Sequence, residues 1–163
     1  MYEDQISLQR LKTLHPSIQM DVELALRSCW ANGFNVRITF GLRTAQEQHF
    51  LYQQGRTRPG KIVTWADAWQ SYHNYGLAWD ICLMIKGNDN LWDMKADMNG
   101  NHIADWMEVV TIFKQIKGCE WGGDWKRPKT DNPHFQLRFG LSTADLMRLK
   151  RENGYPLLSV SVS

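Results

Sequence analysis

Two short segments far apart in the chain carry metal-binding side chains, and the need to bring them together is the strongest constraint on the fold. The first contains His73 and Asp80, and the second contains Asp131 and His134. Together they offer two imidazoles and a carboxylate for one metal, with a second carboxylate to spare. A catalytic zinc takes three such protein ligands and leaves a fourth position open. This inventory is typical of a zinc hydrolase.

The spare carboxylate fits the general base that hydrolysis needs. Such a base must lie within hydrogen-bonding reach of the attacking water. Asp131 lies three residues before His134, so a metal bound to His134 would have this carboxylate close by. The other histidines, His15, His49 and His102, belong to no comparable pattern and stay unassigned.

Length and composition predict one compact domain over residues 1–163. The chain has 163 residues and is 43% hydrophobic, which is enough for one core and too little for two. The net charge of +2 gives no reason to expect a nucleic-acid partner. A mildly basic chain instead favours proximity to an anionic polymer such as a cell wall.

The cysteines and the amino end restrict the cellular setting. Cys29, Cys82 and Cys119 are odd in number and widely spaced, so we expect buried free thiols and no disulfides. Cys82 follows Asp80 by two residues, so a thiol ligand is an alternative to simple packing. We expect no signal peptide, because the acidic start leads into no apolar stretch, and no segment reaches the roughly 18 apolar residues of a membrane helix.

Hydrophobic periodicity and turn residues predict a mixture of helices and short strands. Pro16 and Gly33 suit the two ends of the first helix, and Thr44 with Glu47 forms a capping box for the second. In chain order we expect a helix at 16–32, a strand at 35–40, a helix from 44 to 55, a loop at 55–70, a strand at 78–84, a second loop at 85–101, a helix from 103 to 118, a turn at 121–125, a final strand at 134–137 and a last helix at 142–152.

The two segments also fall into a known pattern, Ser71-x-His73-x-x-Gly76-x-Ala78-x-Asp80 followed by Asp131-x-Pro133-His134-Phe135. This pattern resembles the zinc peptidases that group D-Ala-D-Ala carboxypeptidases and dipeptidases with the L-alanyl-D-glutamate endopeptidases of bacteriophage endolysins. The segments 41–48, 51–60 and 121–126 resemble the endolysin branch in particular. The resemblance covers about 16–137 and leaves a short helical tail, 138–163. It implies an α+β fold in which a small antiparallel sheet carries the zinc and helices flank it.

The resemblance also implies the roles of individual residues. Zinc would be bound by His73, Asp80 and His134, and Asp131 would be the base that activates the attacking water. Arg43 would contact the scissile carbonyl, where negative charge grows in the transition state. An arginine just after a strand can equally pair with a core carboxylate, so both interpretations of Arg43 stay open.

Three polar residues complete the implied site. Ser71 and Gln48 match residues that help to hold the substrate. Gln136 stands where close relatives have an acidic residue two positions after the last histidine, which puts one supporting contact to that histidine in doubt.

The implied function is hydrolysis of the L-Ala-D-Glu bond in the peptidoglycan stem peptide. The chain would be a monomeric phage endolysin that stays in the host cytoplasm until lysis and then reaches the cell wall. One alternative is a D-Ala-D-Ala carboxypeptidase or dipeptidase. Another is a zinc-containing module that binds peptidoglycan without cutting it.

Overall fold

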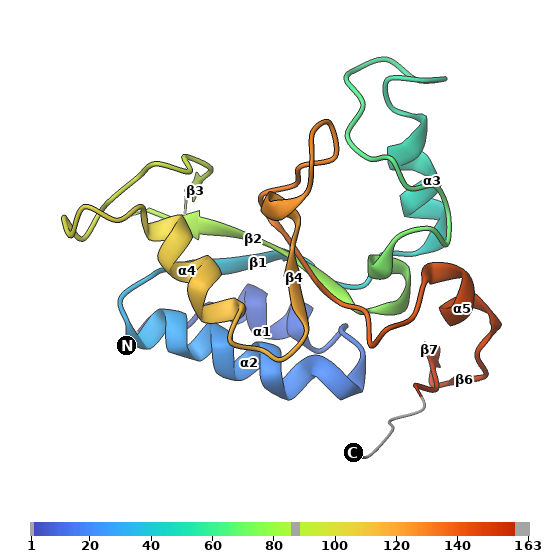
Figure 1. Ribbon diagram of the computed structural model, residues 1–163, viewed down its shortest axis with the longest axis horizontal. Helices are drawn as coiled ribbons and strands as arrows, with labels where there is room; N and C mark the ends of the chain where they lie inside the picture. The colour runs from blue at the N-terminus through green and yellow to red at the C-terminus, as the bar shows by residue number, and fades with distance from the viewer. Residues whose placement is uncertain (1, 86–88, 159–163) are drawn as a thin grey trace.

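The computed structural model describes residues 2–85 and 89–158 and has the predicted α+β architecture (Figure 1). Its main sheet has the strand order β1-β2-β5-β4, with β3 paired to the far end of β2, and every pair is antiparallel. The strands are β1 (Val36–Phe40), β2 (Ala78–Met84), β3 (Asn90–Leu91), β4 (Cys119–Trp121) and β5 (His134–Leu137).

Helices cover one face of this sheet. They are α1 (Gln5–Leu11), α2 (Pro16–Ala31) and α4 (Asp105–Phe113), and Figure 1 shows α1 and α2 beneath the strands. Side chains alternate between the two faces of a strand. Trp79 of β2 and Phe135 of β5 are cross-strand partners whose rings stack at 5.8 Å, and Phe113 of α4 packs against both. The residues next to Trp79 and Phe135 therefore point to the opposite, open face.

Local sequence signals explain the two helices on the amino side of the site. Pro16 occupies the first turn of α2, and Gly33 follows its end with a positive φ of 89°. In α3 (Ala45–Gln53), Thr44 and Glu47 form the expected capping box. Both helices and the loop that follows α3 agree with the sequence-based prediction.

The carboxyl end differs from the prediction. The helix expected at 142–152 is α5 (Thr143–Arg148), and it gives way to a hairpin of β6 (Arg151–Glu152) and β7 (Tyr155–Pro156). Asn153 and Gly154 both have positive φ, as a tight hairpin turn requires. Strand 134–137 is therefore not the last one, and the tail is not purely helical.

Other differences are smaller. Helix α4 ends at Phe113, earlier than the predicted Gly118, and α1, β3 and β4 were not predicted. Cys29 and Cys82 are buried free thiols as expected, whereas Cys119 is only half-buried. Among the described residues, no helix is both long and apolar enough to cross a membrane.

Candidate metal centre

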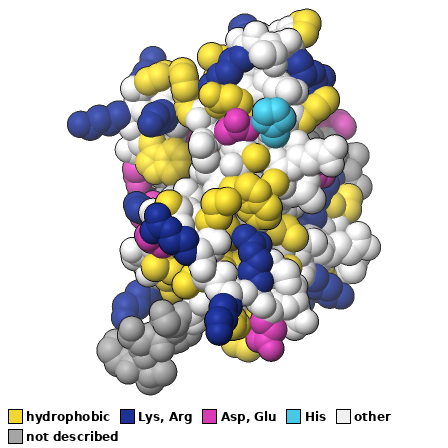
Figure 2. Space-filling model, turned by 90° about the vertical axis from the view of Figure 1, so that its right-hand side faces the viewer, with side chains coloured by type: hydrophobic (Ala, Val, Ile, Leu, Met, Phe, Trp, Pro, Cys, Tyr) yellow, Lys and Arg dark blue, Asp and Glu magenta, His cyan; other side chains and the backbone are white. Residues whose placement is uncertain are grey.

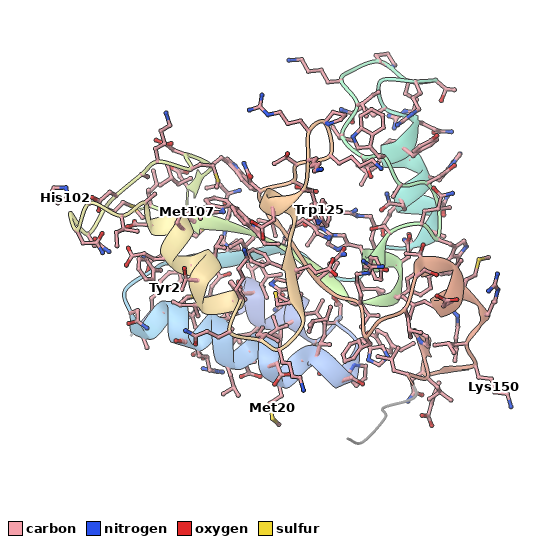
Figure 3. The ribbon with its side chains drawn as sticks, in the orientation of Figure 1. Tyr2, Met20, His102, Met107, Trp125 and Lys150 are labelled. Carbon is pink, nitrogen blue, oxygen red and sulfur yellow. The ribbon has the colours of Figure 1, made fainter. Side chains whose placement is uncertain are left out.

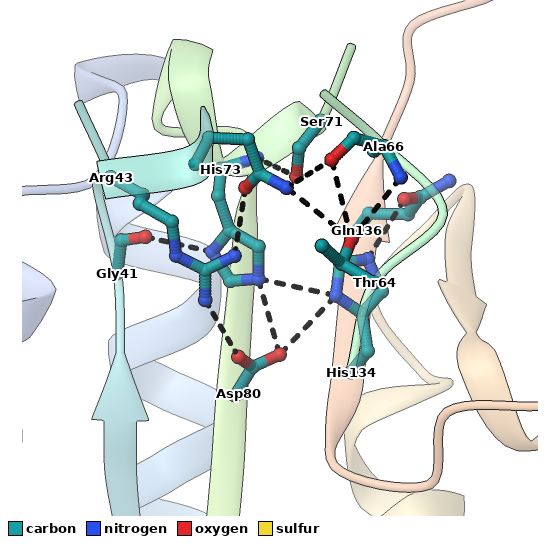
Figure 4. A network of polar contacts seen from close by, with 10 residues as sticks. Gly41, Arg43, Thr64, Ala66, Ser71, His73, Asp80, His134 and Gln136 are labelled. Carbon is teal, nitrogen blue, oxygen red and sulfur yellow. Dashed lines mark hydrogen bonds and ion pairs between the residues drawn. The ribbon is translucent and has the colours of Figure 1, made fainter. Parts of the chain in front are cut away.

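Three side chains with metal-binding atoms meet on the open face of the sheet. His73 lies in the short 3-10 helix η1 (Tyr72–Tyr75), Asp80 on β2 and His134 on β5. The register of these neighbouring strands places Asp80 directly opposite His134. The fold thus joins two residues that the sequence separates widely, and η1 adds the third (Figure 4).

The helix that carries His73 is fixed at both ends. The Ser71 hydroxyl accepts a hydrogen bond from the His73 backbone N–H at 3.3 Å, and Asn74 completes a capping box. Gly76 ends the helix with a φ of 69°, and a Cβ there would lie 2.7 Å from the backbone nitrogen of His15. Ser71 therefore positions a predicted ligand, and its predicted contact with substrate stays a prediction.

The three facing atoms lie at the separations that a shared ion requires. His73 Nε2 is 3.1 Å from Asp80 Oδ1 and 3.2 Å from His134 Nδ1, and the last two atoms are 3.2 Å apart. Ligands bound to one zinc at about 2.0–2.2 Å lie roughly 3–4 Å from one another. The structure therefore brings the predicted ligands together as one set.

The outer nitrogens of both imidazoles have carbonyl partners. His73 Nδ1 donates to the backbone oxygen of Gly41 at 2.8 Å, and His134 Nε2 donates to Gln136 Oε1 at 2.9 Å. The amide of Gln136 is in turn oriented by Glu120, whose carboxylate accepts from Gln136 Nε2 at 2.9 Å. In these tautomers the inner nitrogens both carry lone pairs. Two lone pairs and a carboxylate facing one another fit a cation between them.

Gln136 and Glu120 thus orient the His134 ring, a role that the sequence analysis did not assign to either residue. The doubt about the contact at position 136 was unfounded, because glutamine supplies the carbonyl oxygen that an acidic residue would supply. Glu120 was missed because it reaches the site only through the pairing of strand β4 with strand β5, and no feature of the sequence predicts that pairing.

Among the described residues, only His73, Asp80 and His134 bring three histidine, cysteine, aspartate or glutamate ligand atoms within 4.8 Å of one another. Cys82 is not a member; it is buried with its sulfur 3.6 Å from that of Met84, which supports the packing role. Burial opposes a charge on His134, but pairing with Asp80 outweighs it and raises the pKa of His134. A proton therefore competes with a metal ion, and metal affinity falls as the pH falls.

Asp131 lies at the rim of the same site. Its backbone N–H bonds to the oxygen of Gly122 at 3.0 Å, and its own oxygen accepts from the N–H of His134 at 3.2 Å. A Cβ on Gly122 would lie 2.3 Å from the Asp131 oxygen, so this close approach requires glycine. Desolvation and the negative charge of Asp80 raise the pKa of Asp131. A carboxyl group with a raised pKa is a better proton acceptor than an ordinary one.

Comparisons with known proteins agree with this centre. Residues 64–137 match a peptidase family, M15, described as D-alanyl-D-alanine carboxypeptidase. The chain is 50% identical over 125 residues to the peptidoglycan L-alanyl-D-glutamate endopeptidase CwlK of Bacillus subtilis, covering 76% of this chain and 73% of CwlK. This protein is an M15 peptidase. The fold also matches the crystal structure of the L-Ala D-Glu endopeptidase ChiX of Serratia marcescens, with a TM-score of 0.61, 24% identity, and coverage of 85% of this chain and 91% of that one.

Arg43 of the peptidase pairs with a carboxylate, which is one of the two roles considered for it. One guanidinium nitrogen lies 3.5 Å from Asp80 Oδ2, so the arginine does pair with a carboxylate. That carboxylate belongs to the metal centre, and Arg43 also lines the groove beside it. Its buried Nε has no hydrogen-bond partner among the described residues. Its predicted contact with the scissile carbonyl stays a prediction.

Gln48 lies behind this arginine and out of the groove. It is fully buried, accepts from Arg43 at 3.0 Å, and donates to the backbone oxygen of Ala66 at 2.6 Å. Direct contact with a substrate, as predicted from the sequence, does not fit this burial. Gln48 instead joins Arg43 to the loop that forms one wall of the groove.

The peptidase centre opens into a groove of about 950 Å³. One wall is the loop after α3, with half-exposed Ile62, Val63 and Trp65. The other wall includes Trp125, whose ring lies 5.1 Å from that of His134. Apolar walls around a few polar groups are typical of a site for an extended ligand.

Proposed function

We propose that this peptidase is a zinc-dependent endopeptidase that hydrolyses the L-Ala-D-Glu bond of the peptidoglycan stem peptide. The observation that carries the proposal is the 50% identity to CwlK over 125 residues, which is high enough to favour a shared substrate. The groove supports it, because a bond inside a peptide needs room on both sides of the metal centre.

Zinc is the metal that best fits two imidazoles and a carboxylate. When bound by His73, Asp80 and His134, it would act as a Lewis acid on the peptide carbonyl and promote ionisation of the attacking water. Metal analysis of the purified protein tests the assignment. We expect one zinc per chain, lost in His73→Ala and kept in His49→Ala, which changes an exposed histidine bonded to Asp67. Equal zinc in both variants would contradict it.

The protein's own groups supply proton transfer and charge stabilisation. Asp131 accepts the proton of the attacking water and returns it to the leaving amine. Arg43 stabilises the negative charge that develops on the carbonyl oxygen. No covalent intermediate with the protein is required.

A chemical test distinguishes the bond that is cut. Purified peptidoglycan is digested with the zinc-loaded protein, and the new termini are identified by mass spectrometry. We expect new free amino groups on D-Glu. Release of D-Ala would instead support a D-Ala-D-Ala carboxypeptidase or dipeptidase and overturn the proposal.

The carboxypeptidase alternative needs a positive group to hold the terminal carboxylate of its substrate. Two arginines of the groove already have partners: Arg10 donates to the backbone oxygen of Ile38 at 2.7 Å, and Arg37 pairs with Asp4 at 2.7 Å. A terminal carboxylate would have to compete with these contacts. Lys129 also lines the groove and is exposed, so the digestion experiment decides between the two activities.

The second alternative, a binding module without catalysis, is tested at Asp131. Asp131→Asn should abolish cleavage while the zinc content stays at one per chain. The control is Asp124→Asn, because Asp124 is an exposed aspartate of the same region that pairs with Lys114. Cleavage at the wild-type rate in Asp131→Asn would remove this residue from the mechanism.

We also propose that the protein acts as a monomeric endolysin, held in the host cytoplasm until a membrane pore releases it to the wall. Support comes from the resemblance of segments 41–48, 51–60 and 121–126 to phage endolysins. Lysine and arginine side chains spread over the face that carries α3 and α5, which suits an anionic wall (Figure 2). Expression in bacteria should cause lysis only when a pore-forming protein is co-expressed, and lysis without the pore would contradict this setting.

A further inference from the structure

The loop before α4 carries a second pattern of metal ligands, unrelated to the zinc site. Residues 97–108 read Asp-Met-Asn-Gly-Asn-His-Ile-Ala-Asp-Trp-Met-Glu. Oxygen-bearing side chains stand at positions 1, 3, 5, 9 and 12 of these twelve residues. An EF-hand loop binds calcium through positions 1, 3, 5, 7, 9 and 12, with a glutamate at the last position. The loop therefore has the ligand spacing of a calcium site, and a helix follows as it does in an EF-hand.

The structure folds these twelve residues back on themselves. The carboxylate of Asp97 accepts the backbone N–H groups of Gly100, Asn101 and His102 at 2.7, 3.2 and 2.9 Å. The amides of Asn99 and Asn101 both reach the carboxylate of Glu108, at 3.1 and 3.0 Å. Asp97 at position 1 is thus linked to Glu108 at position 12 through Asn101 at position 5.

Asp105, at position 9, gives an independent indication of a ligand. Its side chain is 1% exposed, and its Oδ1 has no hydrogen-bond partner among the described residues. Its other oxygen accepts from the N–H of Met98 at 3.1 Å, which turns the carboxyl toward the loop. Buried acceptors normally have partners, and a cation would supply the missing one.

The backbone at position 6 has the conformation that a calcium loop needs. EF-hand loops have glycine there because the chain turns sharply. His102 occupies this position with a φ of 69°, a left-handed conformation that histidine adopts less readily than glycine. Figure 3 shows His102 at the outer tip of the loop, so the histidine ring has no packing role that would explain it.

We infer that residues 97–108 bind one calcium ion, with Asp97, Asn99, Asn101, Asp105 and Glu108 as ligands and the backbone oxygen of Ile103 as the ligand at position 7. Calcium is preferred because every candidate is an oxygen and three are carboxylates. The amide oxygens of Asn99 and Asn101, which accept from the N–H groups of Asn101 and Ile103 at 3.0 and 2.8 Å, would turn to the ion and share or give up these hydrogen bonds. Glu108 then exchanges its amide contacts for the ion.

The site would stiffen one wall of the substrate groove. Asn90 and Trp92, just before the loop, line the groove, and the ring of Trp92 lies 6.4 Å from that of Trp106 in the first turn of α4. The loop joins these two tryptophans in the sequence. A calcium ion that fixes the loop therefore also fixes Trp92 relative to α4.

The test uses full-length protein stripped of metals and reloaded with one equivalent of zinc, so that the catalytic ligands are occupied. Calcium chloride is titrated by calorimetry, magnesium chloride serves as the comparison ion, and terbium luminescence sensitised by tryptophan reports the location. We expect one calcium per chain, at least tenfold weaker magnesium binding, and a Tm raised by about 5–10 °C when calcium exceeds its Kd a hundredfold.

Substitutions in the loop test whether the calcium ion binds at residues 97–108. Glu108→Gln and, separately, Asp97→Asn should weaken calcium binding at least tenfold, whereas Asp21→Asn, an exposed aspartate on α2, should leave it unchanged. His102→Gly should bind calcium at least as tightly as the wild type, because it relieves the backbone at position 6. Absence of binding at 10 mM calcium chloride would overturn the inference, and so would full affinity in both Glu108→Gln and Asp97→Asn.

Discussion

At the scale of single residues, the metal centre depends on the groups that orient its ligands. His134 presents one nitrogen to Asp80 and His73 because its other nitrogen is held by Gln136, which Glu120 holds in turn. Such supporting contacts fix the tautomer and direction of a ligand. The chain uses a neutral amide where relatives were expected to have a carboxylate.

Gln136→Leu should weaken zinc binding about 10–100-fold, because His134 loses its acceptor and is free to change tautomer or to rotate. Gln136→Glu keeps an acceptor at the same place and should bind zinc at least as well as the wild type. Competition with a fluorescent zinc chelator measures both. Equal affinity in Gln136→Leu and the wild type would show that this contact does not matter.

Gly122 offers a second test at this scale. A side chain at this position would collide with the backbone oxygen of Asp131 at 2.3 Å, so Gly122→Ala should displace the base. We expect kcat to fall at least tenfold, since a displacement of about 1 Å can cost a factor of 100. Zinc content should stay at one per chain.

The matched control is Gly140→Ala, where an added Cβ meets no atom within 4 Å. Its positive φ of 71° should cost some stability and leave kcat unchanged. If Gly122→Ala retained full kcat, the positioning of Asp131 by Gly122 would not be required for catalysis.

At the scale of elements, a buried ion pair attaches α1 to the sheet. Asp4 caps α1, accepts from Ser7, and pairs with Arg37 of β1 at 2.7 Å. Desolvation acts to raise the pKa of Asp4, but the hydrogen bonds from Arg37 and Ser7 outweigh it and lower the pKa below 3.8. Removing one partner of a buried pair costs about 3–5 kcal/mol, because the other charge is left unpaired.

The lowered pKa fixes the direction of a pH effect. The unfolded state binds a proton more readily than the folded state, so the stabilisation by Asp4 is full at neutral pH and is lost as the pH falls below 3.8 toward the folded-state pKa. Asp4→Asn should lower the free energy of unfolding at pH 7 by about 2–4 kcal/mol and flatten its decline in acid.

Urea denaturation between pH 3 and pH 7 measures this effect. Glu3→Gln is the control, because Glu3 forms an exposed pair with Arg27 that should contribute less than about 1 kcal/mol. An equal loss of stability in the two variants would contradict the importance of the buried pair.

The same pair explains why α1 escaped prediction from the sequence. Seven residues are too few for a helix to be stable alone, and α1 is held through its cap residue Asp4 by Arg37, which lies 33 positions after Asp4. Strand β4 has only three residues and is likewise defined by its partner β5. Helix α2 and strand β2 were predictable because each carries its pattern and its ends in its own sequence.

The carboxyl-terminal hairpin is different, because a local signal existed. Asn153-Gly154 is the strongest short hairpin signal, but the helix predicted at 142–152 covered the residues of strand β6 and ended just before this turn. The hairpin packs back on the amino half: Pro156 contacts His15 at 2.8 Å, and the Tyr155 hydroxyl donates to the oxygen of Thr13 at 2.8 Å. These contacts join distant parts of the chain, which no local pattern reveals.

At the scale of the whole molecule, the fold converts three distant residues into one centre. The sequence pattern named His73, Asp80 and His134, but their separations of 3.1–3.2 Å follow from the register of β2 with β5 and from the capped helix η1. Residue types can be recognised in a sequence. The groups that orient these ligands, such as the Gly41 carbonyl and the Glu120 carboxylate, cannot be recognised in the sequence, because no sequence motif marks a backbone carbonyl or a cross-strand neighbour.

X-ray absorption at the zinc edge tests this convergence most directly. For the protein loaded with one zinc, we predict nitrogen and oxygen neighbours at about 2.0–2.2 Å, the outer-shell pattern of two imidazoles, and no sulfur. The signal of one imidazole should disappear in His134→Ala. A sulfur neighbour at about 2.3 Å, or an unchanged spectrum in His134→Ala, would show that zinc is held by a different set of residues.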